Sequence, residues 1–418
     1  MAAPRLRISD RAVRGKSTND YLIWVGPRFV EAAFFPRGPR AASVACESGA
    51  DASLEARLGR REVWDSSAMA HPLLPALVDE VRSSLGRAEL GVVPYLSTRT
   101  LSGAGNTVIA PDPAVVERWL DKIWARDKLR REGVPVPSSQ VMTLQELESL
   151  DVHNDLVVQL PHGCGGSGTF RLQAGRFSPV APSPDTRLLV SEYVQGIPLN
   201  CCGVVFRDGC VSAWLPSIQL LDLQEEFGRY YGNSWTPLPE GVTEKAREVT
   251  CQTGQVLGAD GYVGSFGVDL IADGENIRVI EVNPRFQGST ALQSRLDRMN
   301  GGPTPLEQHL AALTDLTDKR RPCDSYRRGL SCVRLVSPVS GATRSFDNEL
   351  LRVGGSRLEP GLVPPRFPVV CGAVLCRMVT ARPCYDVPRR SPTPFARGLA
   401  GFADRLLAGG PPREPAQR

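Results

Sequence analysis

The sequence has few lysines and histidines and no regular spacing of cysteines. Its 418 residues include five lysines and four histidines, so arginine supplies nearly all of the positive charge. The histidines lack the partners expected of a zinc site or a catalytic triad. Eleven cysteines are scattered singly apart from the Cys201-Cys202 pair, without any Cys-x-x-Cys. A reducing compartment tolerates this usage, which predicts free thiols and no zinc.

Long apolar runs and a strong charge imbalance are also missing. No stretch approaches the roughly 18 to 20 apolar residues that span a bilayer. The first 20 residues carry arginines and Asp10 in place of the apolar segment of a secretory signal. A net charge of +4 is too small to indicate nucleic acid or an acidic membrane as partner. We expect a cytoplasmic protein with small-molecule partners, and a homodimer stays open.

Residues 264–289 are the most informative stretch. Two short apolar runs, 266–271 and 277–282, flank an Asp-Gly turn signal at Asp273 and Gly274. This pattern predicts a β-hairpin. The hairpin would carry polar side chains at regular positions on both of its strands.

Alternation along the strands places Glu281 and Asn283 on one face, and the hairpin can bring Asp269 beside them. Magnesium favours such oxygen ligands, usually one or two carboxylates with phosphate oxygens completing its shell. Pro284 and Arg285 follow, and the guanidinium of Arg285 suits a phosphate or carboxylate. The alternative interpretation is a solvated strand face with polar residues at every second position.

An acidic residue on one strand followed by Glu-x-Asn-x-Arg on the next resembles the metal-binding signature of the ATP-grasp superfamily. Its members activate a carboxylate with ATP and usually pass it to an amine. The resemblance implies ATP and Mg²⁺ as cofactors, with Mn²⁺ as a substitute. It implies Asp269, Glu281 and Asn283 as metal ligands and Arg285 as the catalytic residue.

Residues upstream resemble further parts of the family pattern in the expected order, so that the resemblance covers about residues 112–290. Lys122 resembles the family's first ATP-binding lysine. Residues 157–161 lead into a glycine segment that resembles the phosphate-covering loop, and residues 188–194 resemble the strand that reads adenine. The implied nucleotide-binding residues are Lys122, Gln159, Gly163, Gly165, Gly166, Gly168, Glu192, Tyr193 and Val194.

The glycine segment also satisfies Gly-x-Gly-x-x-Gly, the fingerprint of a dinucleotide site. That fingerprint must open a helix, whereas residues 169–172 read as a strand, so a strand-loop-strand flap is the better interpretation. Gln159 departs from the family, in which many members carry a second lysine there. An arginine such as Arg171 or Arg187 could supply the missing charge.

The substrate pocket is expected in the polar, aromatic region of residues 219–235. Related ligases often build part of that pocket there, and a surface loop with buried aromatic side chains is an equal alternative. The candidate substrate residues are Gln219, Tyr231, Asn233 and Gln287.

The expected fold class is α/β. An N-terminal open-sheet domain spans 1–111, an ATP-grasp domain spans 112–320 with its flap at about 138–205, a C-terminal subdomain spans 321–408, and a disordered tail spans 409–418. The predicted elements are strands at 21–25, 90–96, 330–336 and 373–380, and helices at 73–85, 112–133 and 395–407.

The implied activity is ATP-dependent formation of an amide or peptide bond between a carboxylate and an amine, through an acyl phosphate, with release of ADP and phosphate. Biotin-carboxylase-like enzymes are the nearest alternative. They continue the motif with Val-Glu-His, where this chain has Gly288, Ser289 and Thr290. A catalytically weak ATP-binding scaffold is the alternative from another class.

Overall fold

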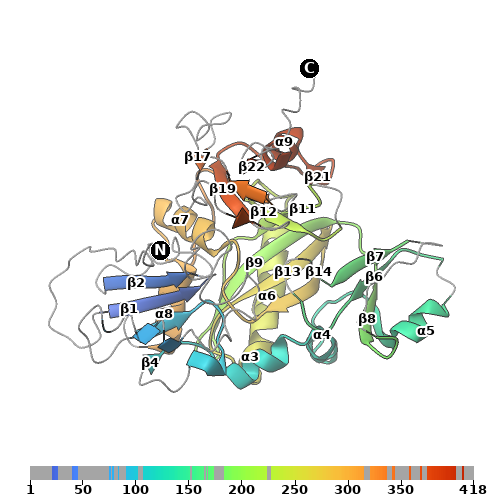
Figure 1. The fold of residues 1–418 in the computed structure, drawn as a ribbon, viewed down its shortest axis with the longest axis horizontal. Coiled ribbons are helices and arrows are strands. Elements are labelled where there is room, and N and C mark those ends of the chain that lie inside the picture. The colour runs from blue at the N-terminus through green and yellow to red at the C-terminus, as the bar shows by residue number, and fades with distance from the viewer. Residues whose placement is uncertain are drawn as a thin grey trace.

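The computed structural model describes residues 91–101, 107–150, 153–163, 166, 168–173, 183–223, 227–314, 321–336 and 374–401, with shorter segments at 21–26, 40–45, 75–76, 78–79, 83, 341–343, 357–358, 368–369 and 407–408. The chain is an α/β protein, which confirms the predicted fold class. A small sheet, a long central sheet and a flap sheet follow one another across the molecule (Figure 1). The tail predicted from 409 onward lies outside the described residues.

The N-terminal sheet is parallel. Its order is β2-β1-β3-β4, with β1 (Tyr21–Gly26), β2 (Arg40–Ala45), β3 (Gly91–Pro94) and β4 (Thr107–Val108). Ile23, Trp24 and Val93 are fully buried, as expected of strands covered on both faces. The predicted strands at 21–25 and 90–96 are therefore confirmed, and the described residues within 73–85 are helical. A 3₁₀ turn, η3 (Arg99–Leu101), follows β3.

The single helix predicted from Asp112 to Gly133 is wrong, because the structure has two. They are α3 (Pro113–Trp119) and α4 (Lys122–Arg131). The Asp112 side chain caps the first helix, and the Asp121 carboxylate accepts from the backbone N–H groups of Ile123 and Trp124 at 2.9 and 3.1 Å. A capping side chain in mid-sequence starts a new helix. Lys122 is thus the first residue of α4.

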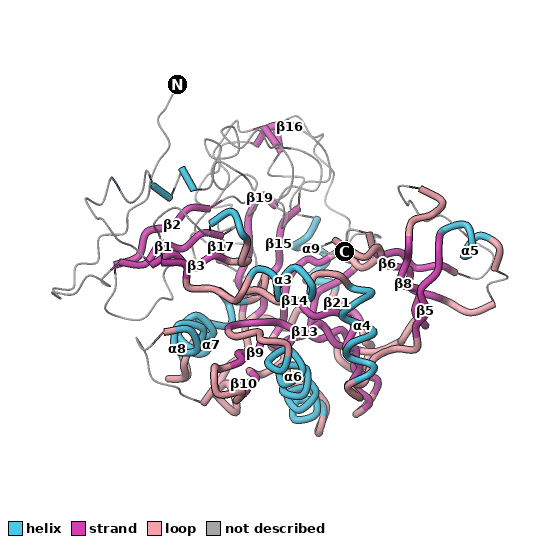
Figure 2. The backbone as a smooth tube through the Cα atoms, turned by 90° about the horizontal axis from the view of Figure 1, so that it is seen from below, coloured by secondary structure: helices cyan, strands magenta, loops and turns pink. Residues whose placement is uncertain are grey.

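The flap is an antiparallel sheet of four strands in the order β5-β8-β6-β7. Its elements are β5 (Ser139–Thr143), α5 (Leu144–Glu148), β6 (Leu156–Gln159), β7 (Thr169–Leu172) and β8 (Arg187–Glu192). A capping box of Thr143 and Glu146 begins α5. Buried side chains that include Leu147 and Val190 form a core separate from the main one. Figure 2 shows β5, β6, β8 and α5 set apart from the central sheet.

The central sheet runs β14-β13-β9-β11-β12-β15-β19-β17, with β10 also paired to β9. Its strands are β9 (Ile197–Val205), β10 (Val211–Ala213), β11 (Ser217–Leu221), β12 (Tyr230–Ser234), β13 (Gly264–Asp273), β14 (Asn276–Asn283), β15 (Ser331–Val336), β17 (Arg357–Leu358) and β19 (Val374–Thr380). The helices are α6 (Val242–Ala259), α7 (Thr290–Met299) and α8 (Pro305–Leu313), of which α6 and α8 pack on β9 and β13. The strands predicted at 330–336 and 373–380 are confirmed.

The C-terminal elements lie above the central sheet in Figure 1. They are β16 (Gly341–Thr343), β18 (Pro368–Val369), β20 (Tyr385–Asp386), β21 (Ser391–Pro392), α9 (Pro394–Ala400) and β22 (Leu407–Ala408). The helix predicted to reach Leu407 is too long, because α9 ends at Ala400 and Leu407 pairs with Thr343 in a strand. The cysteines that the structure describes are free thiols, as predicted. None of the described helices is both long and apolar enough to cross a membrane.

Asp297 is an ionisable side chain buried in the core. It is 0% exposed on α7, and its Oδ1 accepts from the Tyr326 hydroxyl at 2.6 Å. Gln293 Nε2 lies 3.3 and 3.4 Å from its two oxygens. Burial raises the pKa of Asp297 to about 8, although the bonds from Tyr326 and Gln293 oppose the rise. The nearby Cys323 and Glu307 belong to the same buried region.

We predict that Asp297→Asn gains thermal stability relative to the wild type as the pH rises. A carboxyl whose folded-state pKa is raised contributes stability below its unfolded pKa and loses it as the pH approaches the folded value. The difference in Tm should therefore shift toward the variant by at least about 2 °C between pH 5 and pH 9. Thermal melts with exposed Asp324→Asn as control measure it, and a pH-independent difference contradicts the prediction.

Candidate active site

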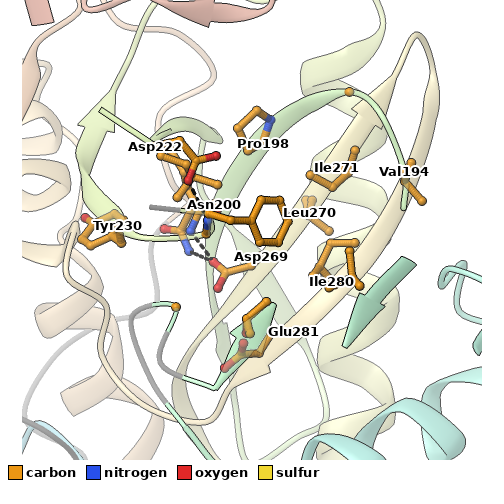
Figure 3. A pocket seen from close by; sticks show the side chains of 18 of the residues that line it. Val194, Pro198, Asn200, Asp222, Tyr230, Asp269, Leu270, Ile271, Ile280 and Glu281 are labelled. Atoms are coloured by element: carbon orange, nitrogen blue, oxygen red, sulfur yellow. Dashed lines mark hydrogen bonds between the residues drawn. The ribbon is translucent and has the colours of Figure 1, made fainter. Parts of the chain in front are cut away.

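A cavity of about 410 Å³ lies where the flap, the central sheet and the C-terminal elements meet. Its walls include Gln159 and Thr169 of the flap and Tyr385 and Arg390 of the C-terminal region. Figure 3 shows the central-sheet side, with Asp269 in the middle of the drawn side chains. The flap, the predicted adenine strand and the predicted metal hairpin therefore all contribute side chains to one cavity.

The predicted hairpin forms the floor of this cavity. β13 and β14 are antiparallel around the Asp273-Gly274 turn, and Asp269 lies directly opposite Glu281. Asn283 Nδ2 donates to Asp269 Oδ2 at 3.0 Å. The three side chains predicted as metal ligands thus come together and line the cavity.

A β-bulge sits within this hairpin. Asp269 pairs with Glu281 and the next residue, Leu270, pairs with Val279, so Ile280 has no partner in the register. Consecutive residues of a regular strand point to opposite faces, yet both Ile280 and Glu281 line the cavity. The bulge re-aims the strand, so that an apolar and an acidic side chain stand side by side.

The carboxylate of Asp269 is surrounded by amide donors. Asn200 Nδ2 and Gln219 Nε2 donate to its Oδ1 at 2.8 and 2.9 Å, in addition to Asn283 on the other oxygen. Burial, followed by the charge of Glu281, raises the pKa of Asp269, whereas Asn200, Asn283 and Arg285 lower it. The site holds two facing carboxyl groups that repel each other when both are ionised.

Gln287 extends this network. It is 4% exposed, and its Oε1 accepts from Asn200 Nδ2 at 2.9 Å. The close approach depends on Gly267, because a Cβ at that residue would lie 2.0 Å from the Gln287 side chain. Glycine on β13 therefore makes room for the Gln287 amide beside the acidic residues.

Arg285 is fixed at both ends of its guanidinium. Its Nη2 donates to Asn283 Oδ1 at 2.8 Å, and its Nη1 donates to the Tyr95 hydroxyl at 2.9 Å. Tyr95 follows β3, so the N-terminal sheet holds the arginine of the central hairpin. Arg285 lines the cavity next to the acidic residues, where a positive charge can meet an anion.

Lys122 is a bridge beside the cavity. Its Nζ donates to the carbonyl of Gly163 in the flap at 2.9 Å and lies 3.4 Å from Glu281 Oε1. The side chain is 9% exposed, so the ammonium is largely shielded from water. One cation therefore connects α4, the glycine segment and the acidic hairpin.

The glycine segment is a strand-loop-strand flap, as predicted. β6 pairs with β7 in antiparallel register, which excludes the helix that a dinucleotide fingerprint needs. Gly166 (φ +92°) rests on the loop between β11 and β12, where an added Cβ would lie 2.4 Å from the Gly228 carbonyl oxygen. Gly168 is described nearby, whereas Gly165 lies outside the described residues.

The predicted adenine strand ends at the cavity, which Glu192, Tyr193 and Val194 line. The backbone N–H groups of Glu192 and Tyr193 donate within the chain, to Ser138 and Asp155 at 3.0 and 3.1 Å. The Glu192 carboxylate also pairs with Arg278 at 3.1 Å. The backbone N–H groups of Glu192 and Tyr193 are thus already engaged within the chain.

The predicted substrate residues separate into two groups. Gln219, Asn233 and Gln287 line the cavity. Tyr231 does not: it is 0% exposed, and its neighbour Tyr230 faces the cavity instead. Side chains alternate along β12, and the sequence prediction chose the wrong one of two adjacent tyrosines.

Gln159 lines the cavity and is 3% exposed. Neither Arg171 nor Arg187, the two arginines suggested to supply the positive charge that Gln159 lacks, lines the cavity. Arg171 pairs with Asp155 and lies over the Tyr193 ring, and Arg187 is exposed on β8. Arg126, which the sequence analysis missed, lines the cavity instead. Its position one helical turn after Lys122 was the available signal.

Arg126 is a buried cation at the edge of the central sheet. Its Nη2 donates to the carbonyl of the bulged Ile280 at 2.8 Å, and its Nη1 lies 3.3 Å from Ser191 Oγ. Burial lowers its pKa to about 10, so it stays charged at neutral pH. Val157, Gln159 and Ser191 share one face of the flap sheet, so Arg126 stands on the face that carries Gln159.

Other lining residues that the sequence did not indicate are Asn200, Asp222 and Tyr230 from the central sheet and Tyr385, Arg390 and Arg397 from the C-terminal region. Two sheets that enclose a cavity with an acidic hairpin, a glycine flap and several cations define a nucleotide-binding protein that clasps its ligand between the sheets. Comparison with known proteins shows which domain this region resembles.

Residues 120–289 match the profile of the ATP-grasp domain. N5-carboxyaminoimidazole ribonucleotide synthase of Synechococcus elongatus is 28% identical over 216 residues, which are 49% of this chain and 51% of that protein. The chain thus spans about half the length of this curated relative. The chain contains an ATP-grasp domain, which confirms the resemblance stated above.

Solved structures of low sequence identity share the fold. Carboxyaminoimidazole ribonucleotide synthase of Aspergillus clavatus, solved with ATP, has a TM-score of 0.61 and 13% identity over 93% of this chain and 100% of its own. The biotin carboxylase domain of Hydrogenobacter thermophilus 2-oxoglutarate carboxylase has a TM-score of 0.60 and 14% identity over 86% of each chain. The matched regions extend beyond the ATP-grasp domain into the N-terminal and C-terminal parts.

We predict that Gly166→Ala weakens ATP binding by preventing the flap from resting on Gly228. Gly209→Ala is a matched control, because Gly209 also has a positive φ of +80° but an added Cβ there meets nothing within 4 Å. Both changes should cost about 1 kcal/mol of stability from backbone strain. Only Gly166→Ala should raise the Kd for ATP measured by calorimetry, and equal Kd values for the two variants contradict the contact.

We also predict that Arg126→Met raises the Kd for ATP about tenfold or more, as expected for loss of a charge-assisted contact. Arg126→Lys should retain most of the affinity if the charge matters. Arg131→Met, an exposed arginine of α4 with 71% exposure, is the control. Equal losses of ATP affinity in Arg126→Met and Arg126→Lys would contradict a charge contact with ATP. They would leave Arg126 only its structural bond with the Ile280 carbonyl.

Proposed function

We propose that the protein is an ATP-dependent ligase that joins a carboxylate to an amine through an acyl phosphate and releases ADP and phosphate. The observation that carries this proposal is the meeting of Asp269, Glu281, Asn283 and Arg285 in a cavity that a glycine flap covers. ATP-grasp relatives support the class of reaction.

The acidic hairpin fits Mg²⁺. It offers two carboxylates and one carboxamide oxygen. The described residues contain no larger cluster, of three or more His, Cys, Asp or Glu side chains, that could hold a metal elsewhere. A set of this size suits a cation that takes its remaining ligands from phosphate and water. A divalent cation would also offset the burial and repulsion that raise the pKa of Asp269. Mn²⁺ fits the same ligands.

Each protein group then has a separate task. Mg²⁺, when bound, supplies charge neutralisation at the phosphates. Lys122 and Arg126 place positive charge at the two edges of the nucleotide, and Val194 meets the base. Arg285 stabilises the oxyanion of the reacting carboxyl group. The flap excludes the water that would hydrolyse an acyl phosphate.

Carboxylation of an amine with bicarbonate is a second candidate. It is favoured by the curated relative, a carboxyaminoimidazole ribonucleotide synthase, and by the biotin carboxylase domain solved with MgADP and bicarbonate. In this case the carboxylate would be bicarbonate, and the same residues would act. Under either proposal we expect a cytoplasmic enzyme, with a homodimer, as in the biotin carboxylase domain, as the expected assembly.

The test is release of phosphate from ATP and Mg²⁺ over a panel of amino acids, small carboxylates and bicarbonate. Turnover that requires both an organic carboxylate and an amine supports the ligase. Turnover with bicarbonate and an amine alone supports carboxylation. ATP binding without turnover under any of these conditions supports the scaffold and contradicts both proposals.

We predict that Glu281→Gln lowers this turnover at least about a hundredfold, because it removes a metal ligand and leaves Lys122 without its partner. Glu275→Gln is the matched control, since Glu275 is exposed at the turn of the same hairpin. Phosphate release at several Mg²⁺ concentrations checks it. Similar rates in the two variants would remove Glu281 from the metal site.

A further inference from the structure

One acidic side chain of the cavity has no task in the proposed reaction. The carboxylates that line the cavity are Glu192, Asp222, Asp269 and Glu281. Glu192 pairs with Arg278 and accepts from the Ser138 N–H, and Asp269 and Glu281 belong to the acidic hairpin. Asp222 remains, and no ion pair among the described residues includes it.

Asp222 is held in a fixed orientation by its own turn. It directly follows β11 and has a φ of +56°, the left-handed region that Asp and Asn tolerate better than most residues. Its Oδ1 accepts from the Gly228 N–H at 2.6 Å, and its backbone N–H donates to the Arg229 carbonyl at 3.2 Å. The flap rests on the same Gly228. The carboxylate is therefore positioned where the closed flap meets the central sheet.

Figure 3 places Asp222 at one end of the cavity. Asp222 and Tyr230 lie on one side of Asp269, and Val194, Ile271 and Ile280 lie on the other. Since Val194 marks the base end, Asp222 stands at the end opposite the adenine. A nucleotide that extends from Val194 to Asp269 would leave Asp222 to face the second substrate.

The surroundings of Asp222 suit a cation. The side chain of Asp222 is exposed to solvent. The protein atoms around it raise the pKa of its carboxyl. The bonds with Gly228 and Arg229 and the more distant charge of Arg171 oppose this rise. In its ionised form the carboxylate keeps acceptor positions beyond the one that Gly228 occupies, and these are open to a ligand. A phosphate or carboxylate ligand would be repelled here.

We propose that Asp222 binds the protonated amino group of the amine substrate and so selects cationic amines. The inference rests on the proposed ligase function and assigns the end of the cavity that the amine occupies. An ammonium donates to the Asp222 carboxylate through a charge-assisted hydrogen bond. Transfer of one of its protons to that carboxylate then frees the nitrogen lone pair, which attacks the acyl carbon and displaces phosphate. Uncharged nucleophiles gain nothing from this contact.

A purely structural role for Asp222 is the competing explanation. In that explanation, Asp stands at this position because it tolerates the left-handed backbone and accepts from Gly228. Asp222→Asn separates the two explanations, because asparagine tolerates the same backbone and its carbonyl oxygen can accept the same bond. The substitution removes the charge alone. Asp208→Asn is the matched control, since Asp208 also accepts from a backbone N–H in a turn but lies outside the cavity.

The experiment compares the wild type and the two variants with ATP, Mg²⁺ and the twenty proteinogenic amino acids as carboxylate and amine donors. Hydroxylamine is added in parallel as a nucleophile that is largely uncharged at neutral pH and traps acyl phosphates as hydroxamates. Phosphate release, amide product and hydroxamate are measured at varied nucleophile concentration. Thermal melts confirm that each variant is folded.

We expect Asp222→Asn to raise the KM for amino acids as nucleophiles at least about tenfold, because one charge-assisted bond is lost. Its KM for hydroxylamine and its hydroxamate yield should stay within about twofold of the wild type. Asp208→Asn should match the wild type with both nucleophiles. This selective effect is the result that a merely structural role does not produce.

Two results overturn the inference while the ligase function stands. One is an unchanged KM for amino acids in Asp222→Asn, and the other is an equal loss with amino acids and hydroxylamine. If the wild type itself gives neither carboxylate-dependent phosphate release nor hydroxamate, the ligase function fails first, and the assignment of Asp222 fails with it. The three outcomes are distinguishable in one set of measurements.

Discussion

The rest of the structure depends on two carboxyl groups that face each other across a buried hairpin. Asp269 and Glu281 occupy paired positions on β13 and β14, where burial and the charge of Glu281 disfavour the charged form of Asp269. The chain surrounds them with compensating groups. Amides from Asn200, Gln219 and Asn283 bond Asp269, and an ammonium lies against Glu281. A folded protein keeps such a costly arrangement where it serves binding or chemistry.

These compensating groups come from different parts of the chain, which ties the domains to the site. Lys122 begins α4 and reaches both Glu281 and the flap carbonyl of Gly163. Arg285 joins the hairpin to Tyr95 of the N-terminal part. Arg126 donates a hydrogen bond to the carbonyl of Ile280, the residue that the bulge leaves without a partner in the register. The flap and the N-terminal part therefore both contact side chains that touch the acidic hairpin.

The hairpin and the meeting of Asp269, Glu281 and Asn283 could be predicted from the sequence because their information is local. A turn signal between two apolar runs fixes the register, and the period of two along a strand fixes the faces. Prediction failed where a local signal was ambiguous. Asp121 caps a second helix inside one continuous pattern, and Tyr230 and Tyr231 differ only by which face of β12 is turned inward. A one-residue choice of this kind is set by tertiary packing.

The contacts of Arg126 and Asp222 could not be predicted for a different reason. Each acts through contacts between segments far apart in the sequence, Arg126 with Ser191 and Ile280, and Asp222 with a loop that the flap covers. No spacing rule links such partners before the fold brings them together.

Together these residues divide the cavity by charge. Arg126 and Arg285 line the cavity, Lys122 lies beside Glu281, and Asp222 lies on the side of Asp269 away from Val194. Phosphates and a reacting carboxylate are anionic, whereas an amine at neutral pH is cationic, so each reactant has an end of the cavity that attracts it and one that repels it. Under the proposed function, this separation of charge would place the amine beside the acyl group before the bond forms.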